Sequence, residues 1–261
     1  MADTIVLIHG AWLTPSSWDR FRQRFEASGM TVAAPPWPFL DRPVDTLRRA
    51  PDPRLAQLGV KPIVDHYAAI IAAMPRAPIV MGHGFGGLIA QCLADRGLGA
   101  AVVSIGAVPP RGVAPAPVAI WNAMPVLTAW NGWNRVLRVT QRGFSSTFGH
   151  ALTDADKAYA HDKFVVPAPG RPFFQAALGI GPGVDWKNPR RPPILLIAGE
   201  KDRIVPPSMV RANYRRHLRS PAPAALYEFA GRSHWLCNEE GWEEVADRAL
   251  SWAVHHRTPG A

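Results

Sequence analysis

Residues 78–87 read Pro-Ile-Val-Met-Gly-His-Gly-Phe-Gly-Gly, and this stretch is the strongest local indication of the fold. Its apolar run, 78–81, is typical of a buried strand, and the glycines that follow permit a very tight turn. The residues after the turn predict a helix over 86–96. A buried strand, a tight turn and a helix in this order indicate one unit of a parallel α/β sheet.

The same alternation of strand and helix extends on both sides of this unit. We expect further strands at 4–8, 31–34, 101–105, 193–198 and 225–229, and further helices at 16–28, 63–74, 207–218 and 239–255. Residues 35–53 are expected to form a proline-rich loop, and residues 109–192 have helical pieces but no good strand. The sequence therefore predicts an α/β fold with a mainly parallel, doubly wound sheet. Its core would comprise residues 1–108 and 193–261, with a helical cap or lid inserted at 109–192.

The composition of the 261 residues excludes several classes of protein. With 48% hydrophobic and 19% charged residues, the chain is not intrinsically disordered. Its 27 prolines are about twice the average usage, which excludes a bundle of long helices. The formal net charge is +9, but the arginines are spread along the chain and no nucleic-acid-binding module accompanies them. We therefore expect no nucleic-acid partner.

Cysteine usage and the N-terminal residues bear on the compartment and on metal binding. Cys92 and Cys237 are far apart and belong to no ligand-like spacing, so we expect free thiols and no metal site. Only four apolar residues, 5–8, precede His9, which is too short for a signal peptide. Prolines interrupt the uncharged stretch 112–134, so it is no membrane span. We expect a cytoplasmic protein without membrane insertion or organic cofactor, and the sequence leaves the oligomeric state open.

Polar motifs follow four of the expected strands, at the edge where active sites of open α/β sheets lie. The motifs read HGAW at 9–12, GHGFGG at 82–87, GEKDRIVP at 199–206 and AGRSHW at 230–235. In order and spacing they resemble the α/β-hydrolase superfamily over essentially the whole chain, and most of all its compact bacterial branch with an HGAW-type oxyanion loop. The resemblance implies that His234 is the catalytic base and that Asp202 is the acid that orients it. It also implies that the backbone N–H groups of Ala11 and Phe85 form an oxyanion hole.

The chain departs from this family at Gly84, where the nucleophile elbow would carry a serine. Without the hydroxyl no acyl-enzyme forms, so two-step ester hydrolysis cannot proceed in its usual form. Three explanations are open: a natural replacement that supports different chemistry, a natural loss of activity, or an engineered removal of the nucleophile. The glycines at 82, 84 and 87 also match a dinucleotide-binding pattern. A dinucleotide site needs a carboxylate at the end of the next strand to bind the ribose, and none is present, so we reject this interpretation.

The remaining groups predict non-covalent acid–base chemistry. His234 would act as a general base on water or directly on a substrate proton, and the oxyanion hole would stabilise the developing negative charge. Cyclisation, isomerisation, elimination or direct hydrolysis of a small apolar carbonyl compound, ester, lactone or epoxide all fit. The alternatives are a serine esterase or lipase-like hydrolase inactivated at its nucleophile, and a non-catalytic ligand-binding protein of the same fold.

Aromatic residues are the candidates for contact with this substrate. We expect Trp12, Trp121, Trp130 and Trp235 at the substrate site, although ordinary packing explains many aromatic residues of a cap. His83 is either a further substrate contact or a structural support. Ser233 neighbours the expected base, but it lies in a loop with no base beyond it, so we do not expect it to replace the missing nucleophile.

Overall fold

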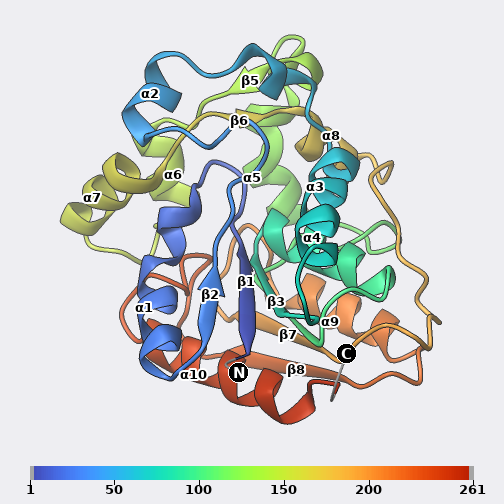
Figure 1. Cartoon of the computed structure of the whole chain (residues 1–261). Coiled ribbons are helices and arrows are strands. Elements are labelled where there is room, and N and C mark those ends of the chain that lie inside the picture. Colours follow the sequence, from blue (N-terminus) through green and yellow to red (C-terminus); the bar gives the residue numbers. More distant parts are fainter. Residues whose placement is uncertain (1–2, 259–261) are drawn as a thin grey trace.

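A six-stranded parallel sheet forms the centre of the computed structural model, which describes residues 3–258 (Figure 1). Its strands are β1 (Thr4–Ile8), β2 (Thr31–Ala33), β3 (Ile79–His83), β4 (Ala101–Ile105), β7 (Ile194–Gly199) and β8 (Ala224–Phe229). They lie in the order β2-β1-β3-β4-β7-β8, and every neighbouring pair is parallel. The expected α/β fold with a mainly parallel, doubly wound sheet is confirmed.

Helices cover both faces of this sheet. One face carries α1 (Asp19–Ala27) and α10 (Trp242–His256), and the other carries α3 (Val60–Ala72), α4 (Phe85–Asp95) and α9 (Pro207–His217). Successive side chains of a strand point to opposite faces. In β1, Ile5 and Leu7 therefore pack with α1 and α10, whereas Val6 and Ile8 pack with the other helices. The sheet is thus buried on both sides, which explains why its central strands read as continuous apolar runs.

Residues 109–192 are here called the cap segment. Their helices and strands lie beyond the carboxyl ends of the sheet strands, whereas the residues after α8 run back along the molecule to the start of β7, where Asn188 donates to the backbone oxygen of Asp95 (Figure 1). Their elements are α5 (Pro117–Leu127), the 3-10 turn η3 (Gly132–Asn134), β5 (Val136–Leu137), α6 (Gln141–Thr147), α7 (Asp154–Phe164), β6 (Ala168–Pro169) and α8 (Arg171–Ala177). The two short strands pair antiparallel. Sequence analysis expected no good strand here, because two residues are too few to display an alternating pattern.

Residues 35–58 differ from the expected proline-rich loop. They contain α2 (Val44–Arg49) and a 3-10 turn, η2 (Pro53–Gln57), just as η1 (Pro15–Trp18) precedes α1. Two of the prolines lie where these elements begin, Pro43 at the N-cap of α2 and Pro53 at the first residue of η2, and neither position requires a helical N–H donor. Arg48 of α2 donates hydrogen bonds to the backbone oxygens of Val165 and His161. This stretch is therefore joined to the cap segment.

Both cysteines, Cys92 and Cys237, are buried free thiols. Burial raises the pKa of Cys92 to about 12, so this thiol stays protonated. Within residues 3–258, none of the helices combines the length and apolar composition that a membrane crossing requires. The same residues contain no cluster of three or more His, Cys, Asp or Glu side chains arranged to hold a metal ion.

Candidate active site

Gly84 forms the sharp turn between β3 and α4. Its backbone has φ +58° and ψ −119°, a conformation that glycine adopts at low cost, and it is the N-cap residue of α4. Its N–H continues the sheet by donating to the oxygen of Ile105 at 3.0 Å. A β-carbon added to Gly84 would lie 3.5 Å from Nε2 of His234 and 3.9 Å from Cα of Gly10. Position 84 therefore faces the imidazole with nothing between them, as expected of a nucleophile position.

His234 and Asp202 form the hydrogen-bonded pair that the motifs implied. Nδ1 of His234 lies 2.6 Å from Oδ2 of Asp202, and both side chains are buried. The other carboxylate oxygen, Oδ1, accepts the N–H groups of Ile204 and Val205, each at 2.8 Å. Because a carboxylate oxygen only accepts hydrogen bonds, Nδ1 of His234 is assigned as the donor to Asp202. Nε2 is left to accept a proton on the side of Gly84.

Two further histidines support the loops around this pair. Nε2 of His83 donates to the backbone oxygen of His234 at 2.8 Å, and burial lowers the pKa of His83 to about 3. Nε2 of His9 accepts the N–H of Trp37 at 3.1 Å, which leaves Nδ1 to donate to the oxygen of Gly10 at 2.9 Å. Burial lowers the pKa of His9 to about 4. Both side chains are neutral, and their tautomers are fixed by these bonds.

Glu239 was not expected at the site, and the expectation that no base lies beyond Ser233 is wrong. The hydroxyl of Ser233 donates to Oε2 of Glu239 at 2.5 Å, and the Ser233 N–H donates to Oε1 at 2.8 Å. The same hydroxyl accepts the N–H of Trp235 at 3.1 Å. Glu239 thus holds the backbone on both sides of His234. Its surroundings, Asn238-Glu239-Glu240, read as an ordinary polar turn, so no signal in the sequence marks it.

The backbone N–H groups of Ala11 and Phe85 are free to bind an oxyanion. Within residues 3–258 neither group donates to an acceptor. Phe85 is the first residue of α4, whose leading N–H groups have no partner inside the helix and whose dipole favours negative charge. Both residues line a small cavity of about 40 Å³ together with Gly84 and His234. That volume has room for a water molecule.

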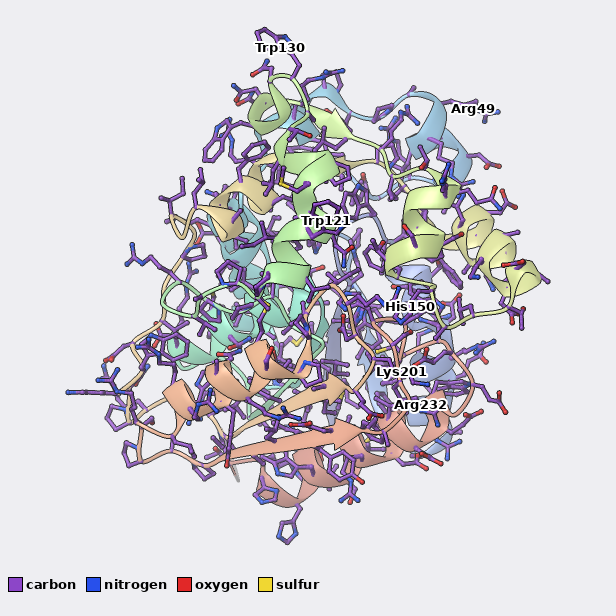
Figure 2. The ribbon with its side chains drawn as sticks, turned by 180° about the vertical axis from the view of Figure 1, so that it is seen from behind. Arg49, Trp121, Trp130, His150, Lys201 and Arg232 are labelled. Carbon is purple, nitrogen blue, oxygen red and sulfur yellow. The ribbon has the colours of Figure 1, made fainter. Side chains whose placement is uncertain are left out.

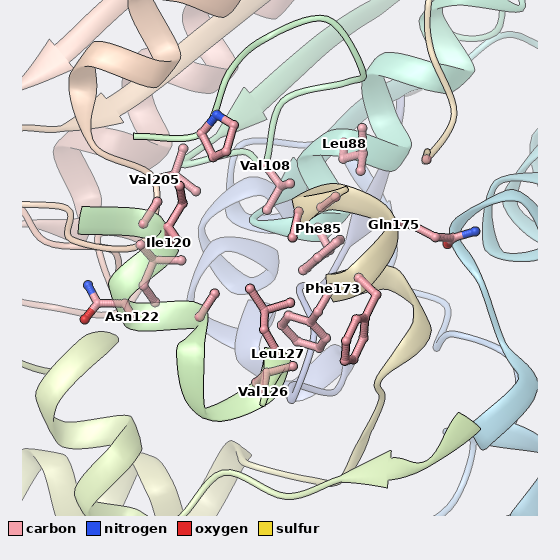
Figure 3. Close-up of a pocket in the computed structure, with 18 of the residues that line it drawn as sticks. Phe85, Leu88, Val108, Ile120, Asn122, Val126, Leu127, Phe173, Gln175 and Val205 are labelled. Carbon is pink, nitrogen blue, oxygen red and sulfur yellow. The ribbon is translucent and has the colours of Figure 1, made fainter. Parts of the chain in front are cut away.

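The small cavity is the inner end of a much larger one. Six residues line both: Trp12, Phe85, Val108, Phe148, Phe173 and Ile204. The large cavity has a volume of about 1120 Å³, and its walls are mainly apolar side chains of α5, α8 and α4 (Figure 3). Ile120, Leu127 and Phe173 point into it in Figure 3. The arrangement joins a small space lined by the imidazole of His234 to an apolar chamber large enough for a drug-sized molecule.

The four tryptophans expected at the substrate site have different positions. Trp12 lines both cavities, with a left-handed backbone (φ 62°) and its ring 4.4 Å from that of Phe173, centroid to centroid. Trp121 lines the large cavity although its side chain is 77% exposed. Trp130 is 87% exposed, projects from the top of the molecule (Figure 2) and lines neither cavity. Trp235 is buried in a separate aromatic cluster and also lines neither cavity.

Comparison with known proteins agrees with this architecture. Residues 5–248 match the model of the alpha/beta hydrolase family. No curated protein sequence gives a significant match.

Several solved structures resemble the chain along its whole length. A monoacylglycerol lipase of Paleococcus ferrophilus shares 19% identity at a TM-score of 0.65, with coverage of 97% of this chain and 94% of that one. A pyrethroid hydrolase of Sphingobium faniae shares 19% identity at 0.67, with coverage of 97% and 98%. A variant of tomato methylketone synthase I, in complex with β-ketoheptanoate, shares 14% identity at 0.69, with coverage of 98% and 99%. At these identities the likeness concerns the fold.

Proposed function

Because the chain belongs to the alpha/beta hydrolase family, we propose that it is an enzyme in which His234 acts as a general base without a covalent nucleophile. One observation carries this proposal. The proton-accepting nitrogen of His234 faces Gly84, so it meets a cavity of about 40 Å³ where the family's mechanism needs a hydroxyl. Everything else that acid–base catalysis needs is present around that nitrogen.

The chemistry follows from the positions of the donors and acceptors. Nε2 of His234 removes a proton from the carbon next to a substrate carbonyl, and Asp202 stabilises the imidazolium that forms. The resulting enolate oxygen accepts the N–H groups of Ala11 and Phe85, which stabilise its charge. His234 then returns the proton at another atom of the substrate. Isomerisation, elimination and cyclisation all begin with such a step. In direct hydrolysis of an ester, lactone or epoxide, the base would instead deprotonate a water molecule in the small cavity.

The cavity of about 1120 Å³ supports an apolar organic substrate. In this proposal residues 1–108 and 193–261 form the catalytic core, and residues 109–192 form the cap that closes the substrate chamber. The cap contributes apolar walls rather than reacting groups, while the core contributes the base and the N–H donors.

A second candidate is a serine hydrolase that has lost its nucleophile. It is favoured by the free space at Gly84, where an added β-carbon would make only ordinary contacts of 3.5 Å or more. The positive φ would strain a serine, but the family's elbows carry this strain routinely. The two candidates differ in whether the present chain, with glycine, still catalyses proton transfer.

Restoring the hydroxyl tests whether the site has kept hydrolase geometry. We expect Gly84→Ser to hydrolyse p-nitrophenyl esters and to react covalently with a fluorophosphonate, because its Oγ would lie within hydrogen-bonding reach of His234. Gly84→Ala, which adds the same backbone strain without a hydroxyl, should do neither. If Gly84→Ser folds but reacts with neither reagent, the base and the N–H donors are not positioned for catalysis by a serine.

Proton exchange tests the base in the unmodified enzyme. We expect the wild type to catalyse deuterium exchange at the α-carbon of apolar ketones and β-keto esters in D₂O, followed by NMR. His234→Ala should lose this exchange, and Gly84→Ser should keep part of it. Exchange that is equally fast in His234→Ala would contradict the proposal. A wild type that binds ketones without exchanging their protons would favour the second candidate.

A further inference from the structure

The large cavity contains positive charge but no negative charge. Among its lining residues in the described chain, Arg111 and Arg138 are the only charged side chains. None of the chain's 20 aspartate and glutamate residues lines it. Asp202, the carboxylate nearest the reactive end, is buried behind His234 and fully hydrogen-bonded. Both arginines are exposed, so a ligand meets apolar walls within the chamber and positive charge where the chamber opens to solvent.

The two arginines differ in what their guanidinium groups contact. Nη2 of Arg138 donates to the backbone oxygen of Arg48 at 2.5 Å. The side chain of Arg111 has no hydrogen-bond or ion-pair partner within residues 3–258, and its guanidinium passes within 3.3 Å of the place that a β-carbon on Gly183 would occupy. The absence of a side chain at Gly183 thus leaves space for this guanidinium. Arg111 is held only through its backbone N–H, which donates to Pro182.

We propose that Arg111 binds the carboxylate of an amphiphilic substrate, whose apolar body fills the cavity. A guanidinium presents two parallel N–H donors that match the two oxygens of a carboxylate, and a single unassisted arginine fits one such monoanion. The apolar walls exclude water from the body of the ligand, while its carboxylate stays at the exposed Arg111. The net charge of +9 also attracts anions to the molecule as a whole. The inference rests on the proposed function in that it takes this cavity as the substrate chamber.

Binding measurements without turnover test the inference. Calorimetric titration of the full chain with decanoate and with decanol compares an anion with a neutral ligand of nearly the same apolar body. We expect decanoate to bind about fivefold more tightly, since an ion pair with an exposed arginine contributes up to about 1 kcal/mol to affinity. Arg111→Gln should remove most of this preference and leave decanol binding unchanged. High salt should weaken decanoate binding to the wild type more than to Arg111→Gln.

Two matched variants make the result specific to Arg111. Arg138→Gln changes the other cavity arginine, and Arg49→Gln changes an exposed arginine that projects from α2 away from the cavity (Figure 2). Both should bind decanoate like the wild type. Equal affinity for decanoate and decanol, or a loss in Arg138→Gln instead of Arg111→Gln, would overturn the inference. His234→Ala should bind decanoate normally, so failure of the proposed catalysis and failure of this binding site are separate results.

Discussion

At the scale of single residues, Gly84 and His234 define what the site can do. Position 84 has no hydroxyl that could donate to Nε2 of His234. On the opposite side of the ring, Nδ1 lies 2.6 Å from Oδ2 of Asp202. A base oriented in this way needs a proton donor in front of it, and the substrate or a water molecule is the available source. Gly106 belongs to the same arrangement, because a β-carbon there would lie 3.3 Å from Oδ2 of Asp202.

Glu239 gives a prediction at this scale. In the Gly84→Ser background, Glu239→Gln should lower kcat for p-nitrophenyl esters about tenfold with little change in KM. If the amide oxygen accepts the Ser233 N–H, the amide nitrogen can only donate to the Ser233 hydroxyl, whose own proton then loses its acceptor. This buried donor is left unpaired, and we expect the imidazole to move.

The exposed neighbour supplies the control, since Glu240→Gln should retain full activity. The pH profile of kcat should also change in Glu239→Gln, as expected when the orientation of a base is altered. If Glu239→Gln lowers thermal stability but leaves kcat and its pH profile unchanged, the carboxylate is only structural.

At the scale of elements, the turn between β3 and α4 depends on how closely the backbone packs. A β-carbon on Gly86 would collide with the backbone oxygens of Ile8 and His9, and one on Gly82 would collide with the backbone of Gly86. These contacts bring α4 against β1, which places Phe85 beside Ala11. Of the glycines that match a dinucleotide-binding pattern, packing therefore explains Gly82 and also Gly87, where a β-carbon would lie 2.4 Å from Cβ of Ala107, whereas Gly84 is explained by its positive φ.

A pair of alanine variants separates this packing from backbone strain. Gly86→Ala should destabilise the protein by about 3 kcal/mol or more, because rigid backbone would have to move. Gly84→Ala, whose β-carbon makes ordinary contacts, should cost only about 1 kcal/mol for its positive φ. Urea unfolding monitored by tryptophan fluorescence measures both. Equal losses of unfolding free energy in the two variants would mean that α4 can shift away from β1.

At the scale of the whole molecule, three buried neutral histidines lie in different layers. His9 and His83 support the site loops, while His217 of α9 donates to Oε1 of Gln91 of α4 at 2.9 Å. Burial is the main reason that the pKa values of His9, His83 and His217 fall, to about 4, about 3 and about 3. Folding therefore requires all three to be uncharged.

The neutral histidines make the folded state less stable as the pH is lowered. An unfolded histidine has a pKa near ~6.5, so between that value and the folded pKa the unfolded chain binds more protons. Stability contributed by the neutral histidines is present above pH ~6.5 and is lost as the pH falls toward about 3. We expect the melting temperature to drop progressively from pH 7 to pH 4. The melting temperature of His217→Gln should fall less steeply over the same pH range. A slope equal to that of the wild type would contradict the assignment of part of this pH dependence to His217.

Local sequence patterns predicted the strands of the sheet and the helices that cover it, and the resemblance to the hydrolase family then implied the His–Asp pair. Buried strands and amphipathic helices have local patterns, and His234 and Asp202 follow strands whose carboxyl ends share one edge of the sheet. The same resemblance drew attention to Gly84, where the elbow motif would carry a serine.

The positions of Glu239, Trp12, Trp130 and Arg111 depend on tertiary contacts that no local sequence pattern indicates. Glu239 is five residues beyond His234 in sequence, yet the turn of the chain brings its carboxylate back to Ser233. Trp12 and Trp130 are the same residue type, but packing places one at both cavities and the other in solvent. Arg111 is one of many arginines, and only the closing of residues 109–192 over the sheet brings it to the cavity. Local patterns follow from short-range geometry, whereas these contacts depend on the direction of side chains across long loops.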